Sequence, residues 1–149
     1  MSLRDWAANG WLRAQPTSPQ EIAGLLAIVD RDLADAAVSA LSADWRFGIA
    51  YNAALKLCTI LVRVSGYRAE RAQQHYRTIA ALPLVLGSPR QDSATYLDTC
   101  RIKRNSAEYD MAGAATEADV DELLVFAREL RRDVLAWLRI HHADLVPGR

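Results

Sequence analysis

Apolar residues recur at three- and four-residue steps along much of this 149-residue chain, and this spacing constrains its fold more than any other feature. Residues 22–40, 49–64 and 120–138 each place their apolar side chains on one face of a helix. No segment alternates apolar and polar residues as a half-buried strand does. The pattern predicts an all-α protein, an up-and-down bundle of four to five helices joined by short loops.

Polar residues and glycines predict where the first two long helices begin and end. Ser18 is a candidate N-cap, Pro19 suits the first helical position, and Glu21 closes a capping box. Asp44 is a plausible cap for the second helix, and Gly66 ends it. These signals place a short loop between the two helices.

Three further helices complete the predicted bundle. One covers residues 68–87, with Pro83 kinking or ending it, and the next runs over residues 92–109. Thr116 caps the last helix, which ends near His142. A loop of small residues separates the last two helices.

The chain is expected to hold one domain with an N-terminal extension. Residues 1–17 form an arm or a short helix, and residues 18–145 form the helical bundle domain. Trp6 and Trp11 lie in the arm, and two indole rings are costly to leave in water. We expect them to dock on the bundle or on a partner.

Charge is neutral overall but unevenly distributed. Lys and Arg together number 18, as do Asp and Glu, so no global field recruits nucleic acid or membrane. Residues 45–104, however, carry ten Lys or Arg against three Asp or Glu. This excess predicts a local basic surface. Most of the cations are Arg, which either reflects phosphate recognition or the base composition of a genome.

The cysteines and the N-terminus indicate a cytoplasmic protein. Cys58 and Cys100 have no CxxC spacing and lie in apolar helical contexts, so we expect buried free thiols in a reducing compartment. Residues 1–16 lack the apolar core of a signal peptide, and no run approaches the roughly 18 apolar residues of a membrane span. Metal-site spacings and glycine-rich phosphate loops are absent, so neither metal nor cofactor is expected.

The stretch RIKRNSAEYD, residues 101–110, combines three cations with amide, carboxylate and phenol groups. On a helical wheel Arg104 falls within an apolar stripe made of Leu97, Cys100, Ala107 and Met111. A buried isolated charge is expensive, and Glu108, four residues on, can pair with Arg104. Lys103 points elsewhere and is expected to be exposed.

Two interpretations fit this stretch. In one, Arg104 and Glu108 form a semi-buried ion pair that fixes the register of the bundle. In the other, the helix presents an edge that binds RNA or nucleotide phosphates, with Tyr109 as a polar or acid–base group. The residues of this candidate edge are Arg101, Arg104, Asn105, Glu108 and Tyr109.

The order of these segments resembles the HEPN family (higher eukaryotes and prokaryotes nucleotide-binding domains). The resemblance rests on AYNAALKLCTILVRVSGYR, then QHYRTIAALPLVLG, RIKRNSAEYD and a long final helix, over about residues 40–142. It implies a bundle that pairs as a homodimer. It also implies an RNA- or nucleotide-binding protein, either a metal-independent ribonuclease of a toxin–antitoxin or defence system, or an inactive partner of a nucleotidyltransferase.

The family motif is an Arg, often followed by a polar residue, with a His after a gap of four to six residues. Arg104 and Asn105 match its beginning, but the gaps lead to Tyr109, Asp110 and Met111. A tyrosine with a pKa near 10 is a poor base at neutral pH. The resemblance therefore predicts fold and dimer more strongly than catalysis.

Other residues add alternatives. Antiparallel packing could bring His75 near Arg104 as a replacement base, or His75 is a half-exposed residue with a structural hydrogen bond. A group of arginines forms either a basic track for a phosphate backbone or a solvated face: Arg63, Arg68, Arg71 and Arg77. Tyr67 and Tyr76 either stack on bases or pack in the core.

Two functions of different classes follow. The first is binding of RNA or nucleotides at the edge around Arg104, with possible cleavage through attack by the ribose 2′-hydroxyl. The second is a catalytically inactive interaction module that binds a nucleotidyltransferase, an antitoxin or another effector protein. In that case the first helix, Trp6 and Trp11 would supply the partner surface.

Overall fold

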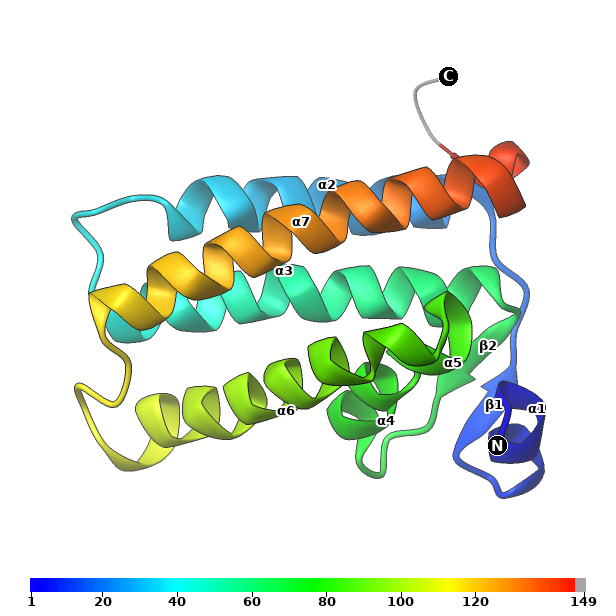
Figure 1. Ribbon diagram of the computed structural model, residues 1–149, viewed down its shortest axis with the longest axis horizontal. Helices are drawn as coiled ribbons and strands as arrows, with labels where there is room; N and C mark the ends of the chain where they lie inside the picture. The colour runs from blue at the N-terminus through cyan, green and yellow to red at the C-terminus, as the bar shows by residue number, and fades with distance from the viewer. Residues whose placement is uncertain (147–149) are drawn as a thin grey trace.

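The computed structural model describes residues 1–146 as a helical bundle with a two-stranded sheet at one end (Figure 1). Four long helices make up the bundle: α2 (Pro19–Ala36), α3 (Ala43–Val64), α6 (Gln91–Asn105) and α7 (Glu117–His141). The all-α bundle predicted from the sequence is confirmed. In Figure 1, α2 and α7 lie on one side of α3, and α4 and α6 lie on the other.

Shorter elements fill the connections. They are α1 (Leu3–Ala8), β1 (Leu12–Ala14), β2 (Tyr67–Ala69), α4 (Gln74–Ala80), α5 (Leu82–Leu86), η1 (Ser88–Arg90), η2 (Ser106–Asp110) and η3 (Ala143–Leu145). The predicted helix over residues 68–87 is therefore wrong at its start and divided in its middle. Pro83 lacks the N–H that a continuous helix would need there, so a new helix, α5, begins at Leu82.

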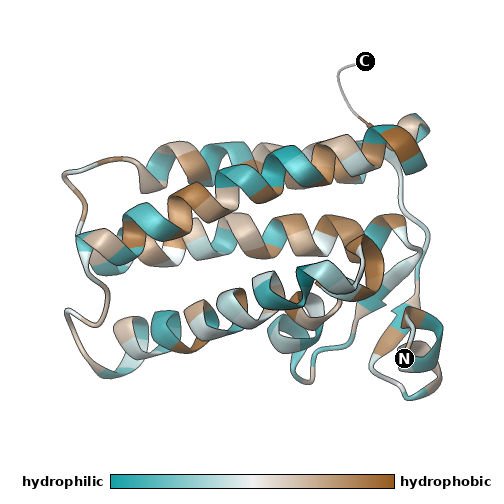
Figure 2. Ribbon diagram, in the orientation of Figure 1, coloured by the Kyte–Doolittle hydropathy of each residue, from teal (hydrophilic) through white to brown (hydrophobic). Residues whose placement is uncertain are grey.

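The core is built around α3, which is buried along most of its length. Ala50, Ala53 and Ala54 are fully buried, and their small side chains let neighbouring helices approach closely. Leu57 and Ile60 are fully buried as well. Figure 2 shows α3 mainly in pale and brown shades with a few teal positions, whereas α7 carries alternating brown and teal bands typical of an amphipathic surface helix.

Helix α3 is also more apolar than the sequence analysis expected. An 18-residue window of this 22-residue helix has a mean hydropathy of 1.4, so by length and composition the helix could cross a membrane, contrary to the expectation that no run would qualify. In the fold, 67% of this apolar window is buried inside the bundle. Its position in the core of the bundle accounts for this composition.

The capping roles predicted for Glu21 and Asp44 are wrong. Ser18 caps α2 as expected by accepting from the Glu21 N–H, but the Glu21 carboxylate binds Thr17 and Arg63 instead of closing a capping box. Asp44 does not cap α3, because Ser42 takes that place and accepts from the Trp45 N–H.

The N-terminal residues dock on the bundle. Strand β1 pairs antiparallel with β2, a sheet the sequence analysis missed because three-residue strands show no alternation. Trp6 is 7% exposed and packs with Val62 and Ala81. The Arg77 guanidinium lies 3.6 Å from the centroid of the Trp11 ring, a cation–π contact between the arm and α4. Of the two alternatives for the tryptophans, docking on the bundle is confirmed.

Helix α7 begins at the predicted cap, Thr116, which forms a capping box with Asp119. The Thr116 hydroxyl accepts from the Asp119 N–H at 3.1 Å, and the Asp119 carboxylate accepts from the Thr116 N–H at 2.9 Å. Two otherwise unpaired backbone donors are thereby satisfied.

Replacing Thr116 with Ala should lower the free energy of unfolding by about 1 kcal/mol, because the cap hydroxyl is lost. Urea denaturation followed by circular dichroism measures this change. Thr116→Ser keeps a hydroxyl and serves as the control, with stability close to wild type. An Ala variant as stable as the Ser variant would contradict the capping role.

Candidate functional site

The stretch RIKRNSAEYD lies where the helix type changes. Helix α6 ends at Asn105, and η2 continues as a π-helical turn closed by a hydrogen bond from the Met111 N–H to the Ser106 carbonyl, at 2.8 Å. The wider turn shifts side chains away from their places on a regular helical wheel. Met111 is 62% exposed, so the predicted apolar stripe is wrong at this end. π-helical turns are frequent at functional sites.

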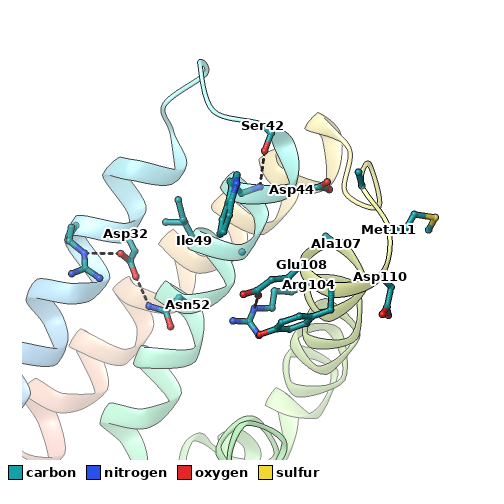
Figure 3. A pocket seen from close by; sticks show the side chains of 15 residues that line it. Asp32, Ser42, Asp44, Ile49, Asn52, Arg104, Ala107, Glu108, Asp110 and Met111 are labelled. Atoms are coloured by element: carbon teal, nitrogen blue, oxygen red, sulfur yellow. Dashed lines mark hydrogen bonds and ion pairs between the residues drawn. The ribbon is translucent and has the colours of Figure 1, made fainter.

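Arg104 forms the ion pair that its spacing predicted. Its Nε lies 2.9 Å from Glu108 Oε2, and its Nη1 donates to Asn105 Oδ1 at 3.2 Å. The Arg104 side chain is nevertheless 26% exposed and lines a cleft of about 650 Å³ (Figure 3). Arg104 lies close to Gly48 on α3, where an added Cβ would make an ordinary van der Waals contact with Arg104 Cγ at 3.9 Å. The pair is therefore formed but remains open to solvent.

The cleft around Arg104 is acidic. Figure 3 shows Asp32 and Asn52 on one wall and Arg104 with Glu108 across from them. The lining holds two arginines against four carboxylates, a net charge of −2: Arg31 and Arg104, with Asp32, Asp44, Glu108 and Asp110. Trp45 adds an aromatic ring that is 63% exposed. This balance favours a cationic or apolar guest over a phosphate. We call it the acidic cleft.

Asp44 positions the loop that follows η2. Its carboxylate accepts from the Gly113 N–H at 2.7 Å and from the Ala115 N–H at 3.0 Å. These two backbone hydrogen bonds lower the pKa of Asp44. The residue assigned to capping by sequence reasoning thus anchors the segment that leads from the candidate site into α7.

Arg101, one turn earlier on α6, faces a different part of the surface. It lines an open hollow of about 720 Å³ together with Arg71, Gln73, Gln74, His75 and Tyr76. None of these residues is a carboxylate, although Asp98 pairs with Arg101 from outside the lining, at 2.7 Å. We call this site the basic hollow. The structure therefore divides the predicted edge between two surfaces of opposite charge.

Tyr51 connects the two surfaces and was missed by sequence reasoning. Its hydroxyl lies 3.4 Å from His75 Nδ1, and its ring centroid lies 5.8 Å from the Arg104 guanidinium carbon. His75 and Arg104 thus both approach one residue of α3, as the hypothesis of antiparallel packing required. The available signal was a phenol hydroxyl inside an apolar helix, which needs a hydrogen-bond partner.

His75 is held neutral in this environment. Burial lowers its pKa, and the positive charges of Arg104, Lys56 and Arg101 lower it further. Burial also raises the pKa of Tyr51, so its hydroxyl stays protonated. Among the described residues that hydroxyl has only His75 Nδ1 as a partner, and an unsatisfied buried donor is costly. We therefore assign the His75 proton to Nε2, which makes this nitrogen a hydrogen-bond donor.

This tautomer weighs against His75 as a replacement base, because its basic nitrogen, Nδ1, is engaged by Tyr51. Tyr109 is 72% exposed on the rim of the acidic cleft. The Lys103 side chain, expected to be exposed, is 37% exposed and also pairs with Asp119 at the start of α7, at 3.1 Å. Two cations of the stretch RIKRN, Lys103 and Arg104, are therefore engaged in ion pairs within the fold.

Two of the four arginines in the predicted basic track are engaged within the fold. Arg63 pairs with Glu21 at 2.9 Å, and Arg77 stacks on Trp11. The side chains of Arg68 and Arg71 form no ion pair or hydrogen bond with another residue of the described chain. Gln73, beside Arg71, has a φ of 53°, a left-handed conformation that costs a residue with a Cβ about 1–2 kcal/mol. Strained backbone of this kind occurs at binding sites.

No protein-family model, curated protein or solved structure compared with this chain matches it. The resemblance to the HEPN family stays a prediction. Within residues 1–146, no three His, Cys, Asp or Glu side chains are grouped in a way that could hold a metal ion. Cys58 and Cys100 are buried free thiols, as predicted.

His75 should make stability depend on pH. Its pKa in the folded protein lies below the ordinary 6.5, so the unfolded chain binds more protons between the two values. The free energy of unfolding should therefore fall as the pH is lowered from 7 through this window. Urea denaturation at several pH values measures the effect, and His75→Gln should remove this contribution. NMR titration reads the pKa directly, and a value at or above 6.5 would contradict the assignment.

Proposed function

We propose that this protein binds phosphate groups of RNA or nucleotides in the basic hollow, as a HEPN-like helical bundle. The observation that carries the proposal is the composition of the hollow. Two arginine side chains, two amide side chains and the imidazole of His75 converge there without a carboxylate in the lining. All of these groups offer hydrogen-bond donors to an anion.

The arginines suit this role individually. Arg71 is exposed and unpaired, so its guanidinium is available to a ligand. Arg101 is held by Asp98 in a half-exposed ion pair, an interaction that solvent weakens. Guanidinium groups match phosphate oxygens in a two-pronged geometry. Tyr76, 43% exposed beside them, supplies a ring on which a base can stack.

Arg104 acts indirectly in this proposal. Glu108 neutralises it in the acidic cleft, but its charge still reaches His75 and favours the neutral imidazole. The resemblance over residues 40–142 supports an RNA- or nucleotide-binding role in a toxin–antitoxin or defence setting in the cytoplasm. We propose binding and leave cleavage out of the function, because neither Tyr109 nor the engaged Nδ1 of His75 is a suitable base.

Arg71→Ala and Arg101→Ala should each weaken RNA binding about tenfold, the loss of about one charged hydrogen bond. Each should also reduce the slope of log affinity against log salt by about one, because one phosphate contact is removed. Fluorescence anisotropy with a labelled single-stranded RNA measures both. Arg128→Ala, which removes an exposed arginine from α7, is the matched control. Unchanged binding in both hollow variants would refute the proposal.

A second candidate function, the interaction module, is favoured by the acidic cleft. Trp6 is buried, so the surface expected around Trp6 and Trp11 is wrong. Exposed apolar side chains instead gather at the cleft, where Trp45 is 63% and Met111 is 62% exposed. With its negative lining, this surface fits an effector protein, such as a nucleotidyltransferase, that presents basic side chains beside an apolar one.

A peptide of alternating Arg and Leu residues is a probe for this second function. Trp45→Ala should weaken its binding about tenfold or more, because exposed aromatic side chains contribute strongly to interfaces. Isothermal titration calorimetry measures the affinity. Val125→Ala removes an exposed apolar residue of α7 and is the control. Equal affinities of wild type and the Trp45 variant would argue against the cleft as a partner surface.

A further inference from the structure

A smaller pocket adjoins the basic hollow. Its volume is about 200 Å³, and His75 and Gln74 line both spaces. Helix α3 contributes Lys56 and Thr59 to its wall, and strand β2 contributes Arg68. No carboxylate lines it. The hollow and the pocket are therefore two compartments separated by His75 and Gln74, and both are positive.

The pocket contains cations that the fold does not neutralise. Arg63 is paired with Glu21, but the side chains of Lys56 and Arg68 form no ion pair or hydrogen bond with any other described residue. Arg68 also lies directly opposite Arg13 in the β1–β2 ladder, and like charges in that position destabilise a strand pair. An anion in the pocket would relieve this repulsion.

The two compartments are electrostatically close. Lys56 borders the pocket, Arg101 borders the hollow, and both act on His75, which lies between them. Because His75 and Gln74 line both spaces, only these two side chains separate a group bound beside Lys56 from one bound beside Arg101. The pocket is smaller than the roughly 300–1,000 Å³ of sites that hold whole organic ligands, so it suits a single compact group.

We propose that the pocket is a second phosphate site, so that the protein binds ligands with two separated phosphates, such as successive phosphates of an RNA strand. This inference rests on the proposed function. One phosphate contacts Arg71 and Arg101 in the hollow, and the next contacts Lys56 and Arg68 in the pocket. His75 lies between them and donates from Nε2. The substrate class is therefore a polynucleotide backbone, in preference to a nucleoside monophosphate.

The test compares three small ligands by isothermal titration calorimetry. Adenosine 5′-monophosphate occupies one compartment, and adenosine 3′,5′-bisphosphate can reach both. Adenosine 5′-diphosphate has two adjacent phosphates and controls for the number of phosphate groups. We expect the 3′,5′-bisphosphate to bind at least about tenfold more tightly than either other ligand, a gain of about 1.4 kcal/mol.

Variants locate the second site. Lys56→Ala should remove the advantage of the bisphosphate and leave the affinity for the monophosphate unchanged, whereas Arg71→Ala should weaken all three ligands. The Lys56 side chain forms no ion pair or hydrogen bond with another described residue, and Lys56→Gln gives a second variant that keeps a polar side chain but removes the charge. Arg128→Ala again serves as the control. Circular dichroism verifies the fold of each variant.

The outcomes separate the two proposals. Measurable monophosphate binding without a bisphosphate advantage would overturn the second site and leave the basic hollow in place. An advantage that persists in both Lys56 variants would also overturn it, because the extra phosphate would then be bound elsewhere. If none of the three ligands binds, the proposed function fails and this inference fails with it.

Discussion

The burial of α3 is the constraint on which the rest of the structure depends. Polar side chains on a helix enclosed by α2, α4, α6 and α7 must find partners, since unpaired buried polar groups are costly. Arg46 donates to the Ala36 carbonyl at 2.8 Å and pairs with Glu117, which joins the end of α2 to the start of α7. The Asn52 amide donates to the Asp32 carboxylate, and the Tyr51 hydroxyl lies 3.4 Å from His75 Nδ1. The polar residues of the core helix thereby position both candidate surfaces.

The stretch RIKRNSAEYD does not form one anion-binding edge, because its two arginines face different surfaces. Arg104 faces a cleft with a net charge of −2, whereas three residues earlier Arg101 faces a hollow with two arginines and no lining carboxylate. The resemblance implied a homodimer in which copies of the edge face each other. Two such clefts brought together would repel, so charge disfavours that arrangement at this edge. The homodimer stays a prediction.

The predictions that hold depend on local spacing, although the local capping roles expected of Glu21 and Asp44 did not hold. The long helices and the Thr116 cap depend on residues within a few positions of one another, and these predictions hold. So does the Arg104–Glu108 pair, which is set by i, i+4 spacing. The β1–β2 ladder joins Leu12 to Ala69, and the contact of Tyr51 with His75 depends on how α4 packs on α3. No local sequence pattern indicates the β1–β2 ladder or the contact between Tyr51 and His75. The π-helical turn shows no periodicity of its own, so the helical wheel failed there.

The unpaired cations near His75 do not contribute to the stability of the fold. The protein as a whole is neutral, and many of its cations are paired with carboxylates on neighbouring helices. Lys56, Arg68 and Arg71 are not, although they lie around a half-buried neutral His75. Each adds to a positive potential that opposes folding locally. An anion bound among them would be attracted by this potential and would favour protonation of His75, so proton and anion would each strengthen the binding of the other. Local departures from the most stable charge arrangement are expected at functional sites.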